Sequence, residues 1–296
     1  MSHYEPAKPG TTLAGFKVMG EIGRGAASII YLVQAPKTKQ IKALKHVEKR
    51  DEKDSRFLIQ AEREYEVAQK VKHPNIRAIE KLIKVRRRLI SVSELFLVME
   101  YVDGVSMEKS PPQTFEAALH AFVQVAKALE NMHAAGFVHA DMKPNNVVVD
   151  GQGGIKVIDL GQACPVGTVK ERIQGTPNFI APEQAHLREI LPATDVYNLG
   201  ATMYWCLTRR YIPTAMREGD TSGTPISDSL IDKPTPPIVH NARIPQALSD
   251  LIVNCVKVDV DDRLMMGEVV ETLEVIEEEL DEPGAPQGVE EANEAG

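Results

Sequence analysis

The sequence predicts an α+β protein with a small sheet-rich lobe followed by a larger helical lobe. The first hundred of its 296 residues consist mostly of short β-branched and apolar runs, and beyond about residue 105 helical periodicity replaces them. We divide the chain into a flexible N-terminal arm (1–15), the small lobe (16–101), the large lobe (102–280) and an acidic tail (281–296). Proline, glycine and charged residues dominate both ends, which we expect to be disordered.

The small lobe should contain strands and one helix. Runs bounded by glycine, proline or basic residues predict strands at 16–22, 27–35, 41–47, 78–85 and 95–102. Apolar residues recur at helical spacing between Leu58 and Val71, which predicts a helix over 57–71.

The large lobe should be helical. Residues 114–135 carry one apolar face and end before Gly136, which is typical of a helix terminus. Residues 196–208 are apolar nearly all round, and this indicates a helix buried in the centre of the lobe. Two more helices are predicted around 246–257 and 266–280.

Composition excludes several classes of protein. The net charge of -8 disfavours a nucleic-acid binder, which needs a basic surplus to neutralise phosphates. Three widely separated cysteines indicate neither a disulfide framework nor a zinc site. The first residues lack the apolar core of a signal peptide, and the chain lacks an apolar stretch of about 18 residues. We therefore expect a cytoplasmic protein that does not bind membranes; no oligomeric state is predicted.

Two features of the small lobe could bind phosphate. Gly23 and Gly25 lie between two predicted strands, where glycine would let the backbone approach a polyanion, although by themselves they are better explained by a plain β-hairpin turn. Lys45 lies on a predicted strand, either facing solvent or held by a carboxylate of the helix at 57–71. Glu62, Glu64 and Glu66 are all candidates for that partner, and spacing alone does not choose among them.

The segment HADMKPNN, residues 139–146, carries groups suited to phosphoryl transfer. Asp141 could accept a proton from an attacking hydroxyl, Lys143 could neutralise a phosphoryl oxygen, and Asn146 could bind a hard cation. Asp159 ends a β-branched strand thirteen residues later and could supply a second oxygen ligand. In isolation, a polar loop with an Asn-Asn turn explains the same residues.

The order and spacing of these motifs resemble the eukaryotic-type (Hanks-type) serine/threonine protein kinases, and more particularly their soluble bacterial members. The resemblance covers about residues 16–280. It rests on Gly23-x-Gly25, Ala43-Leu44-Lys45, Glu64 before the HPNI turn, His139-Ala-Asp141, Asp159-Leu-Gly161, Gly175-Thr176-Pro177, Ala181-Pro182-Glu183, Asp195 and Arg263. It implies a bilobal kinase fold, an enzyme that phosphorylates serine and threonine of protein substrates with ATP and Mg²⁺ (or Mn²⁺ as a substitute), and autophosphorylation.

The resemblance also implies a role for each matching residue. Lys45, paired with Glu64, would hold the α- and β-phosphates. Asp141 would deprotonate the substrate hydroxyl, and Lys143 would steady the γ-phosphate. Asn146 and Asp159 would bind the metal. The expected nucleotide-binding residues are Ile22, Gly23, Gly25, Ile30, Ala43, Lys45, Met99, Glu100, Val102 and Val148. Glu183 and Arg263 should form a buried ion pair, and Asp195 should anchor the loop.

One departure concerns regulation. Ala140 stands where many kinases have an arginine that binds a phosphate on the activation segment, so we hypothesise that basal activity does not require phosphorylation of Thr168. Two alternatives to a protein kinase stay open. A pseudokinase would keep the fold without the chemistry, although Lys45, Asp141 and Asp159 are all present. A small-molecule phosphotransferase of the aminoglycoside or choline kinase type shares the loop, although the segment GTPNFIAPE argues against it.

Overall fold

The computed structural model describes residues 5–25, 27–87, 91–216 and 224–281. The chain forms two compact units. The small unit comprises the chain up to Lys72 and the segment Arg77–Val102, and the large unit comprises His73–Ile76 and the chain from Asp103 onward. The sequence predicted a single boundary, after residue 101, whereas residues 73–76 also belong to the large unit.

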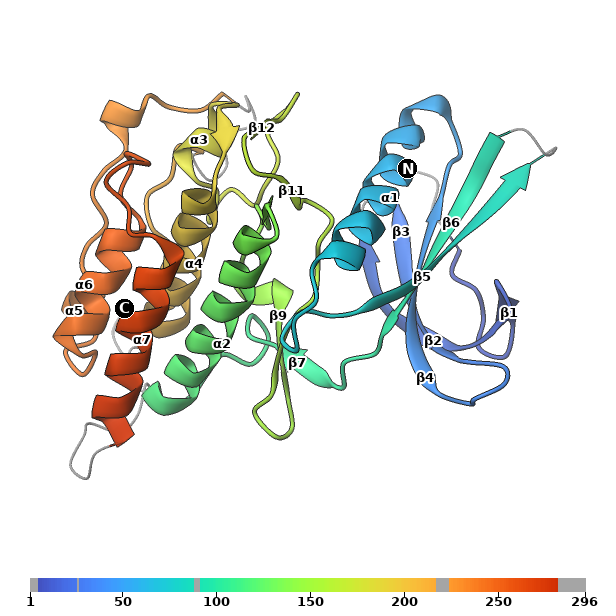
Figure 1. Ribbon diagram of the computed structural model, residues 1–296, viewed down its shortest axis with the longest axis horizontal. Helices are drawn as coiled ribbons and strands as arrows, with labels where there is room; N and C mark the ends of the chain where they lie inside the picture. Colours follow the sequence, from blue (N-terminus) through green and yellow to red (C-terminus); the bar gives the residue numbers. More distant parts are fainter. Residues whose placement is uncertain (1–4, 26, 88–90, 217–223, 282–296) are drawn as a thin grey trace. The chain divides into compact units, whose positions relative to one another are not determined.

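The small unit is an antiparallel sheet with one helix (Figure 1). Its strands are β1 (Thr12–Leu13), β2 (Phe16–Gly25), β3 (Ser28–Gln34), β4 (Ile41–Glu48), β5 (Ile79–Arg87) and β6 (Ser91–Glu100), in the order β1-β2-β3-β4-β6-β5. A short 3-10 turn, η1 (Glu52–Asp54), leads into α1 (Ser55–Lys70). The α1 helix starts two residues before the predicted position, directly after η1, whose start is capped by Asp51 accepting the backbone N–H groups of Lys53 and Asp54.

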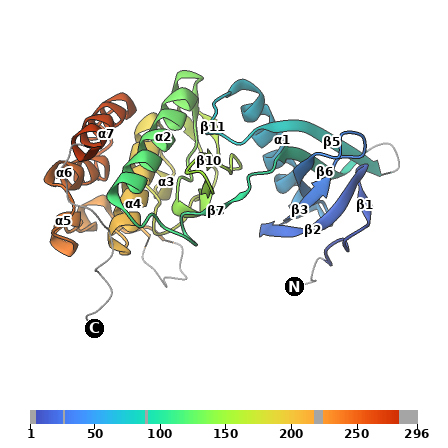
Figure 2. The ribbon, with the colours of Figure 1, turned by 90° about the horizontal axis from the view of Figure 1, so that it is seen from below.

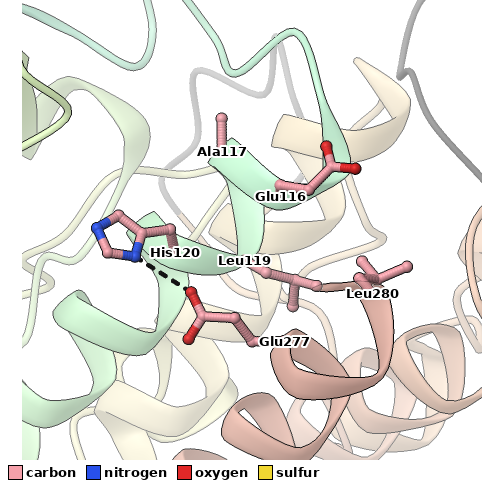
Figure 3. A pocket seen from close by; sticks show the side chains of 6 residues that line it. All are labelled: Glu116, Ala117, Leu119, His120, Glu277 and Leu280. Carbon is pink, nitrogen blue, oxygen red and sulfur yellow. Dashed lines mark hydrogen bonds and ion pairs between the residues drawn. The ribbon is translucent and has the colours of Figure 1, made fainter. Parts of the chain in front are cut away.

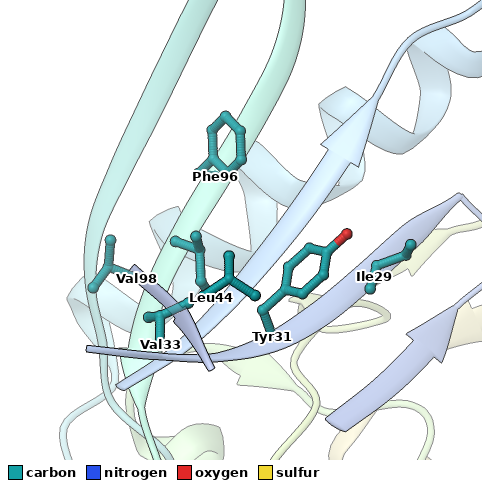
Figure 4. Packing of buried hydrophobic residues seen from close by; sticks show 7 residues of the cluster. Ile29, Tyr31, Val33, Leu44, Phe96 and Val98 are labelled. Atoms are coloured by element: carbon teal, nitrogen blue, oxygen red, sulfur yellow. The ribbon is translucent and has the colours of Figure 1, made fainter. Parts of the chain in front are cut away.

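Alternation along the strands separates two faces of this sheet. Leu44 lies beside Tyr31 on β3 and Val98 on β6, and these three side chains belong to an apolar cluster on one face (Figure 4). Its buried members are Val18, Ile29, Tyr31, Val33, Leu44, Phe96 and Val98. Successive residues of a strand point to opposite faces, so Ala43 and Lys45 lie on the other face.

The residues before β2 are more ordered than expected. Thr12 and Leu13 form β1, which pairs with β2, and Leu13 packs against the apolar cluster. The backbone N–H of Ala7 donates to the hydroxyl of Tyr31 at 3.1 Å. The prediction of a flexible arm over 1–15 is therefore wrong for this stretch, because small and apolar residues among the polar ones cover an apolar sheet face.

The large unit is mainly helical (Figure 2). Its helices are α2 (Phe115–Ala134), α3 (Pro182–Ala185), α4 (Pro192–Thr208), α5 (Pro237–His240), α6 (Gln246–Cys255) and α7 (Met266–Asp281), with 3-10 turns η2 (Pro144–Asn146) and η3 (Asp228–Leu230). Short strands form three small sheets: β7 (Gly104–Ser106) with β9 (Val147–Asp150) and β10 (Ile155–Val157), β8 (Phe137–Val138) with β11 (Cys164–Pro165), and β12 (Thr168–Val169) with β13 (Glu189–Ile190).

Helix α4 is buried on nearly every side, as its sequence predicted. It begins at Pro192, four residues before the expected start, because proline is favoured at the first helical position. Helix α7 extends to Asp281, which had been assigned to the tail; the rest of the predicted tail lies outside the described residues. No helix in the described ranges is long and apolar enough to cross a membrane.

Helices α2 and α7 pack side by side. His120 and Lys127 of α2 pair with Glu277 and Glu274 of α7 at 3.1 and 2.6 Å. Figure 3 shows the hollow beside the first of these pairs, which Leu119 and Leu280 also line. None of the candidate site residues lines this hollow.

Candidate active site

The glycine-rich segment is the hairpin between β2 and β3. Gly23 lies opposite Ile30, and Gly25 lies opposite Ser28. A Cβ on Gly25 would lie 2.7 Å from the Ser28 Oγ, so only glycine fits there without displacing the serine. A strand rather than a helix follows, which excludes the dinucleotide-binding arrangement and leaves a hairpin with a close backbone approach.

Lys45 pairs with Glu64 and not with the two neighbouring glutamates. The Lys45 Nζ lies 2.6 Å from the Glu64 Oε2, and the Glu64 side chain is fully buried. Glu64 lies on the buried side of α1, whereas Glu62 pairs with Lys84 and Glu66 is exposed. Helical periodicity explains this choice, because position 64 follows Ala61 by three residues on the face that packs on the sheet.

Register brings further predicted nucleotide-binding residues onto the face that carries Lys45. Ile30 lies opposite Lys45, and Ala43 lies opposite Met99. Ala43 and Met99 are buried, whereas the side chain of Ile22 is exposed. Glu100 and Val102 lie at and just beyond the end of β6, and the N–H of Glu100 donates to the carbonyl of Ala78 at 2.9 Å.

In the large unit, Asp141 is held by a compact polar group. The Lys143 Nζ lies 2.9 Å from the Asp141 Oδ2 and donates to the Thr176 Oγ1 at 2.7 Å. The Thr176 hydroxyl donates to the other carboxylate oxygen, Oδ1, at 3.0 Å. The Asn146 Nδ2 donates to the backbone carbonyl of Asp141 at 2.8 Å. Carboxylate, ammonium and hydroxyl thus form a closed triangle around the Asp141 side chain.

Asn146 of this group and the nearby Asp159 both carry side-chain oxygen atoms. Asp159 follows β10, and the N–H of its neighbour Ile158 donates to the carbonyl of Asn146 at 2.9 Å. One Asp159 oxygen accepts the N–H of Gly161 at 2.9 Å. The Asn146 amide nitrogen is already committed to Asp141, so its oxygen is the atom that a cation would use. Val148 lies on β9, which begins directly after Asn146.

The side-chain oxygens of Asn146 and Asp159 fit Mg²⁺ better than a metal that requires three or more protein ligands. In the described residues, no group of three histidine, cysteine, aspartate or glutamate side chains is arranged to hold a metal. Mg²⁺ takes hard oxygen ligands and commonly uses one or two protein side chains together with substrate phosphates. Asn146 and Asp159 match that pattern.

The backbone that precedes Asp141 is fixed by a buried carboxylate. Asp195 of α4 accepts the N–H groups of His139 and Ala140, both at 2.8 Å, as the sequence analysis expected. The His133 Nε2 also lies 2.8 Å from Asp195, a contact that sequence reasoning missed. These contacts hold Ala140 in a left-handed conformation with φ of 60°.

The position of the missing arginine is occupied by apolar packing. Ala140 is buried in a cluster with Val138, Cys164 and Ile190. Burial raises the pKa of the Cys164 thiol, and nearby Lys170 opposes this only in part. An apolar environment of this kind would strip water from a guanidinium group without providing a counter-charge.

The segment after Asp159 is braced on two sides, which the sequence did not predict. Strand β11 pairs with β8, and β12 pairs with β13. The Thr168 hydroxyl donates to the carbonyl of Pro165 at 2.6 Å. Two-residue strands carry too little periodicity to be recognised in a sequence.

Glu183 and Arg263 form a buried ion pair, as expected. Two parallel contacts of 2.8 and 2.9 Å join the guanidinium to the carboxylate. The guanidinium also donates to the carbonyls of Ala193, Lys257 and Val258 and lies over the Tyr197 ring. Burial raises the pKa of Tyr197 well above its ordinary value.

Comparison with known proteins agrees with this fold. The family profile of the protein kinase domain matches residues 16–273, so the chain belongs to the protein kinase family. Within that family it is similar to serine/threonine kinases of bacteria.

The relatives include the probable serine/threonine-protein kinase PknB of Lactococcus lactis, 27% identical over 260 residues, 84% of this chain and 39% of that protein. Serine/threonine-protein kinase PrkC of Bacillus subtilis is 27% identical over 265 residues, 86% of this chain and 39% of that protein. Mitogen-activated protein kinase kinase 2 of Arabidopsis thaliana is 25% identical over 283 residues, 92% and 75% of the respective chains. The chain thus spans about two-fifths of the length of these bacterial relatives.

Proposed function

We propose that this chain is an ATP-dependent protein kinase that transfers the γ-phosphate of Mg-ATP to serine and threonine hydroxyls of cytoplasmic proteins, itself included. The observation that carries the proposal is the triangle formed by Asp141, Lys143 and Thr176. It combines a proton acceptor, a cation for phosphoryl charge and a positioning hydroxyl within hydrogen-bond distance of one another.

In the proposed reaction the Asp141 carboxylate accepts the proton of the substrate hydroxyl. Its Oδ1 already accepts from Thr176, but a carboxylate oxygen has a second lone pair for the substrate. Lys143 stabilises the negative charge that gathers on the transferred group. Because phosphoryl transfer depends on positioning and charge stabilisation, these fixed contacts are where we expect the rate acceleration to arise.

Each unit offers residues that would bind the nucleotide or its metal. Lys45, fixed by Glu64, would bind phosphate oxygens, and the sheet face with Ile30, Ala43 and Met99 would contact the adenine. Asn146 and Asp159 would hold Mg²⁺, which when bound neutralises phosphate charge. The 2.6 Å contact between the Lys45 Nζ and the Glu64 carboxylate supports this, because it fixes the position of the ammonium group.

Activity without phosphorylation of Thr168 is part of the proposal. The apolar cluster around Ala140 and the β12–β13 pairing brace the segment that a phosphate would otherwise fix. We therefore expect Thr168→Ala to keep basal activity on an added substrate. A folded Thr168→Ala protein that is inactive would contradict this part.

The experiment that tests the activity is transfer of ³²P from γ-labelled ATP to casein and to the chain itself, with Asp141→Asn as the matched control. We expect incorporation by the wild type and a loss of at least about 100-fold in the control, because the proton acceptor is removed. Choline and an aminoglycoside serve as small-molecule substrates.

Each outcome bears on the proposal. Transfer to protein that is lost in Asp141→Asn supports it. Binding of Mg-ATP, seen as thermal stabilisation, without any transfer would indicate a pseudokinase. Turnover of the small alcohols alone would indicate a small-molecule phosphotransferase.

A further inference from the structure

Gln184 of α3 is a buried amide that uses all its hydrogen-bonding capacity. Its Nε2 donates to the carbonyl of Ala140 at 2.8 Å and to that of Gln174 at 3.4 Å. Its Oε1 accepts from the Ala181 N–H and the Asn198 Nδ2, both at 3.0 Å. The opposite orientation of the amide would set oxygen against two carbonyls, so the network defines which atom is which.

The contact with Ala140 acts on the peptide unit that leads into Asp141. A peptide group is planar, so holding the carbonyl of residue 140 also fixes the N–H and Cα of residue 141. That N–H donates to the His139 Nδ1 at 3.3 Å. Gln184 therefore fixes the carbonyl side of the peptide, while Asp195 fixes the two N–H groups before it.

This support matters because the backbone there is strained. A non-glycine residue in the left-handed region, such as Ala140 with φ of 60°, is sterically unfavourable and persists only where its surroundings enforce it. Without the amide of Gln184, the carbonyl of Ala140 would be buried without its donor, and the 140–141 peptide could rotate.

The same side chain connects Asp141 to the segment that precedes α3. Thr176 contacts the Asp141 carboxylate, while Gln184 contacts the carbonyls of Ala140 and Gln174 and the N–H of Ala181. Residues 174–184 thus hold both the side chain of Asp141 and the peptide before it.

We propose that Gln184 is a positioning residue for phosphoryl transfer, which acts by holding the 140–141 peptide so that the Asp141 carboxylate meets the substrate hydroxyl. The inference rests on the proposed kinase activity. A misplacement of about 1 Å can cost about 100-fold in rate, so loss of this contact should lower kcat and leave ATP binding nearly unchanged.

The test compares two substitutions with a matched control in the full chain. Gln184→Met removes all four hydrogen bonds at similar volume, and Gln184→Glu keeps an acceptor oxygen while removing the amide donor. Ser249→Ala, on α6, removes the hydrogen bond that the buried Ser249 hydroxyl accepts from the N–H of Ile238, away from this network.

We expect kcat per folded molecule to fall about 10- to 100-fold in both Gln184 variants, with KM for ATP within about twofold of wild type, and to stay unchanged in Ser249→Ala. A purely structural role would reduce the folded fraction and leave kcat per folded molecule intact. A kcat within twofold of wild type in folded Gln184→Met would overturn the proposal.

A second measurement does not depend on activity. Amide hydrogen exchange over residues 137–143 should be faster in Gln184→Met than in wild type or Ser249→Ala, because the 139–141 backbone loses support. Unchanged exchange there would refute the inference even in a protein without transferase activity. An inactive wild type with this exchange pattern would instead contradict only the proposed function.

Discussion

Removal of the Arg263 guanidinium should destabilise the large unit severely. Arg263→Met leaves the Glu183 carboxylate buried without its partner, and both side chains are almost completely inaccessible, at 0% and 2% exposure. Breaking such a pair from one side costs about 3–5 kcal/mol, because an uncompensated charge stays in the interior. Glu183→Leu should cost a similar amount for the same reason.

The double variant Arg263→Met/Glu183→Leu should lose much less than the sum. It contains no buried charge, so its main cost is the loss of the three backbone carbonyl contacts that Arg263 makes, about 1 kcal/mol each. Two single losses of about 3–5 kcal/mol and a double loss of about 3 kcal/mol give a coupling energy of about 3–7 kcal/mol.

The assay is urea denaturation followed by the fluorescence of Trp205. This is the only tryptophan of the chain and lies on α4, so its signal reports on the large unit. Arg263→Lys is the matched control: it keeps the charge but loses the two-pronged contact, and we expect an intermediate loss. Additivity of the single losses to within about 0.5 kcal/mol would refute the reasoning, since it would mean that the two residues act independently.

Two further perturbations test the environment of single side chains. Burial lowers the pKa of His46, and the hydrogen bond to Glu94 offsets this only in part, so the unfolded chain takes up a proton at a higher pH than the folded one. The free energy of unfolding should therefore decline as the pH falls below about 6.5. In thermal denaturation followed by circular dichroism, His46→Gln should make this dependence of stability on pH less steep. An unchanged dependence would assign it to other groups. Ala140→Arg forces a long charged side chain into an apolar cluster and should lower the free energy of unfolding by about 1–3 kcal/mol, measured by Trp205 fluorescence. Ala140→Gly suits the left-handed backbone and should leave the free energy of unfolding nearly unchanged. An arginine variant as stable as the wild type would show that the cluster accommodates the longer side chain readily.

Sequence reasoning located the longer helices and the main strands of the small unit because each carries a helical apolar stripe or an extended apolar run. The apolar run of β4 and the apolar stripe of α1 were both readable, and the all-round apolar character of α4 predicted its burial. The pairing of Lys45 with Glu64 could be singled out only by resemblance, since three glutamates fall within five positions and tertiary packing decides which one is buried.

The features that sequence reasoning missed leave no periodic pattern of apolar residues in the sequence. Gln184 is one of two polar residues in a four-residue helix, and nothing in its neighbours indicates that its amide reaches a residue 44 positions away. The strands β1, β12 and β13 are each two residues long, too short for an alternation to be visible.

The assignment of His73–Ile76 to the large unit affects how this protein can be dissected. Asn75 donates its side-chain amide to Gln124 and to the carbonyl of Ile155, and its own carbonyl accepts the N–H of Val157. A fragment beginning at Asp103 would leave these three partners exposed to water. The larger half is therefore not a contiguous stretch of sequence, and a recombinant version of it would need the tetrapeptide HPNI supplied in trans or joined through a linker.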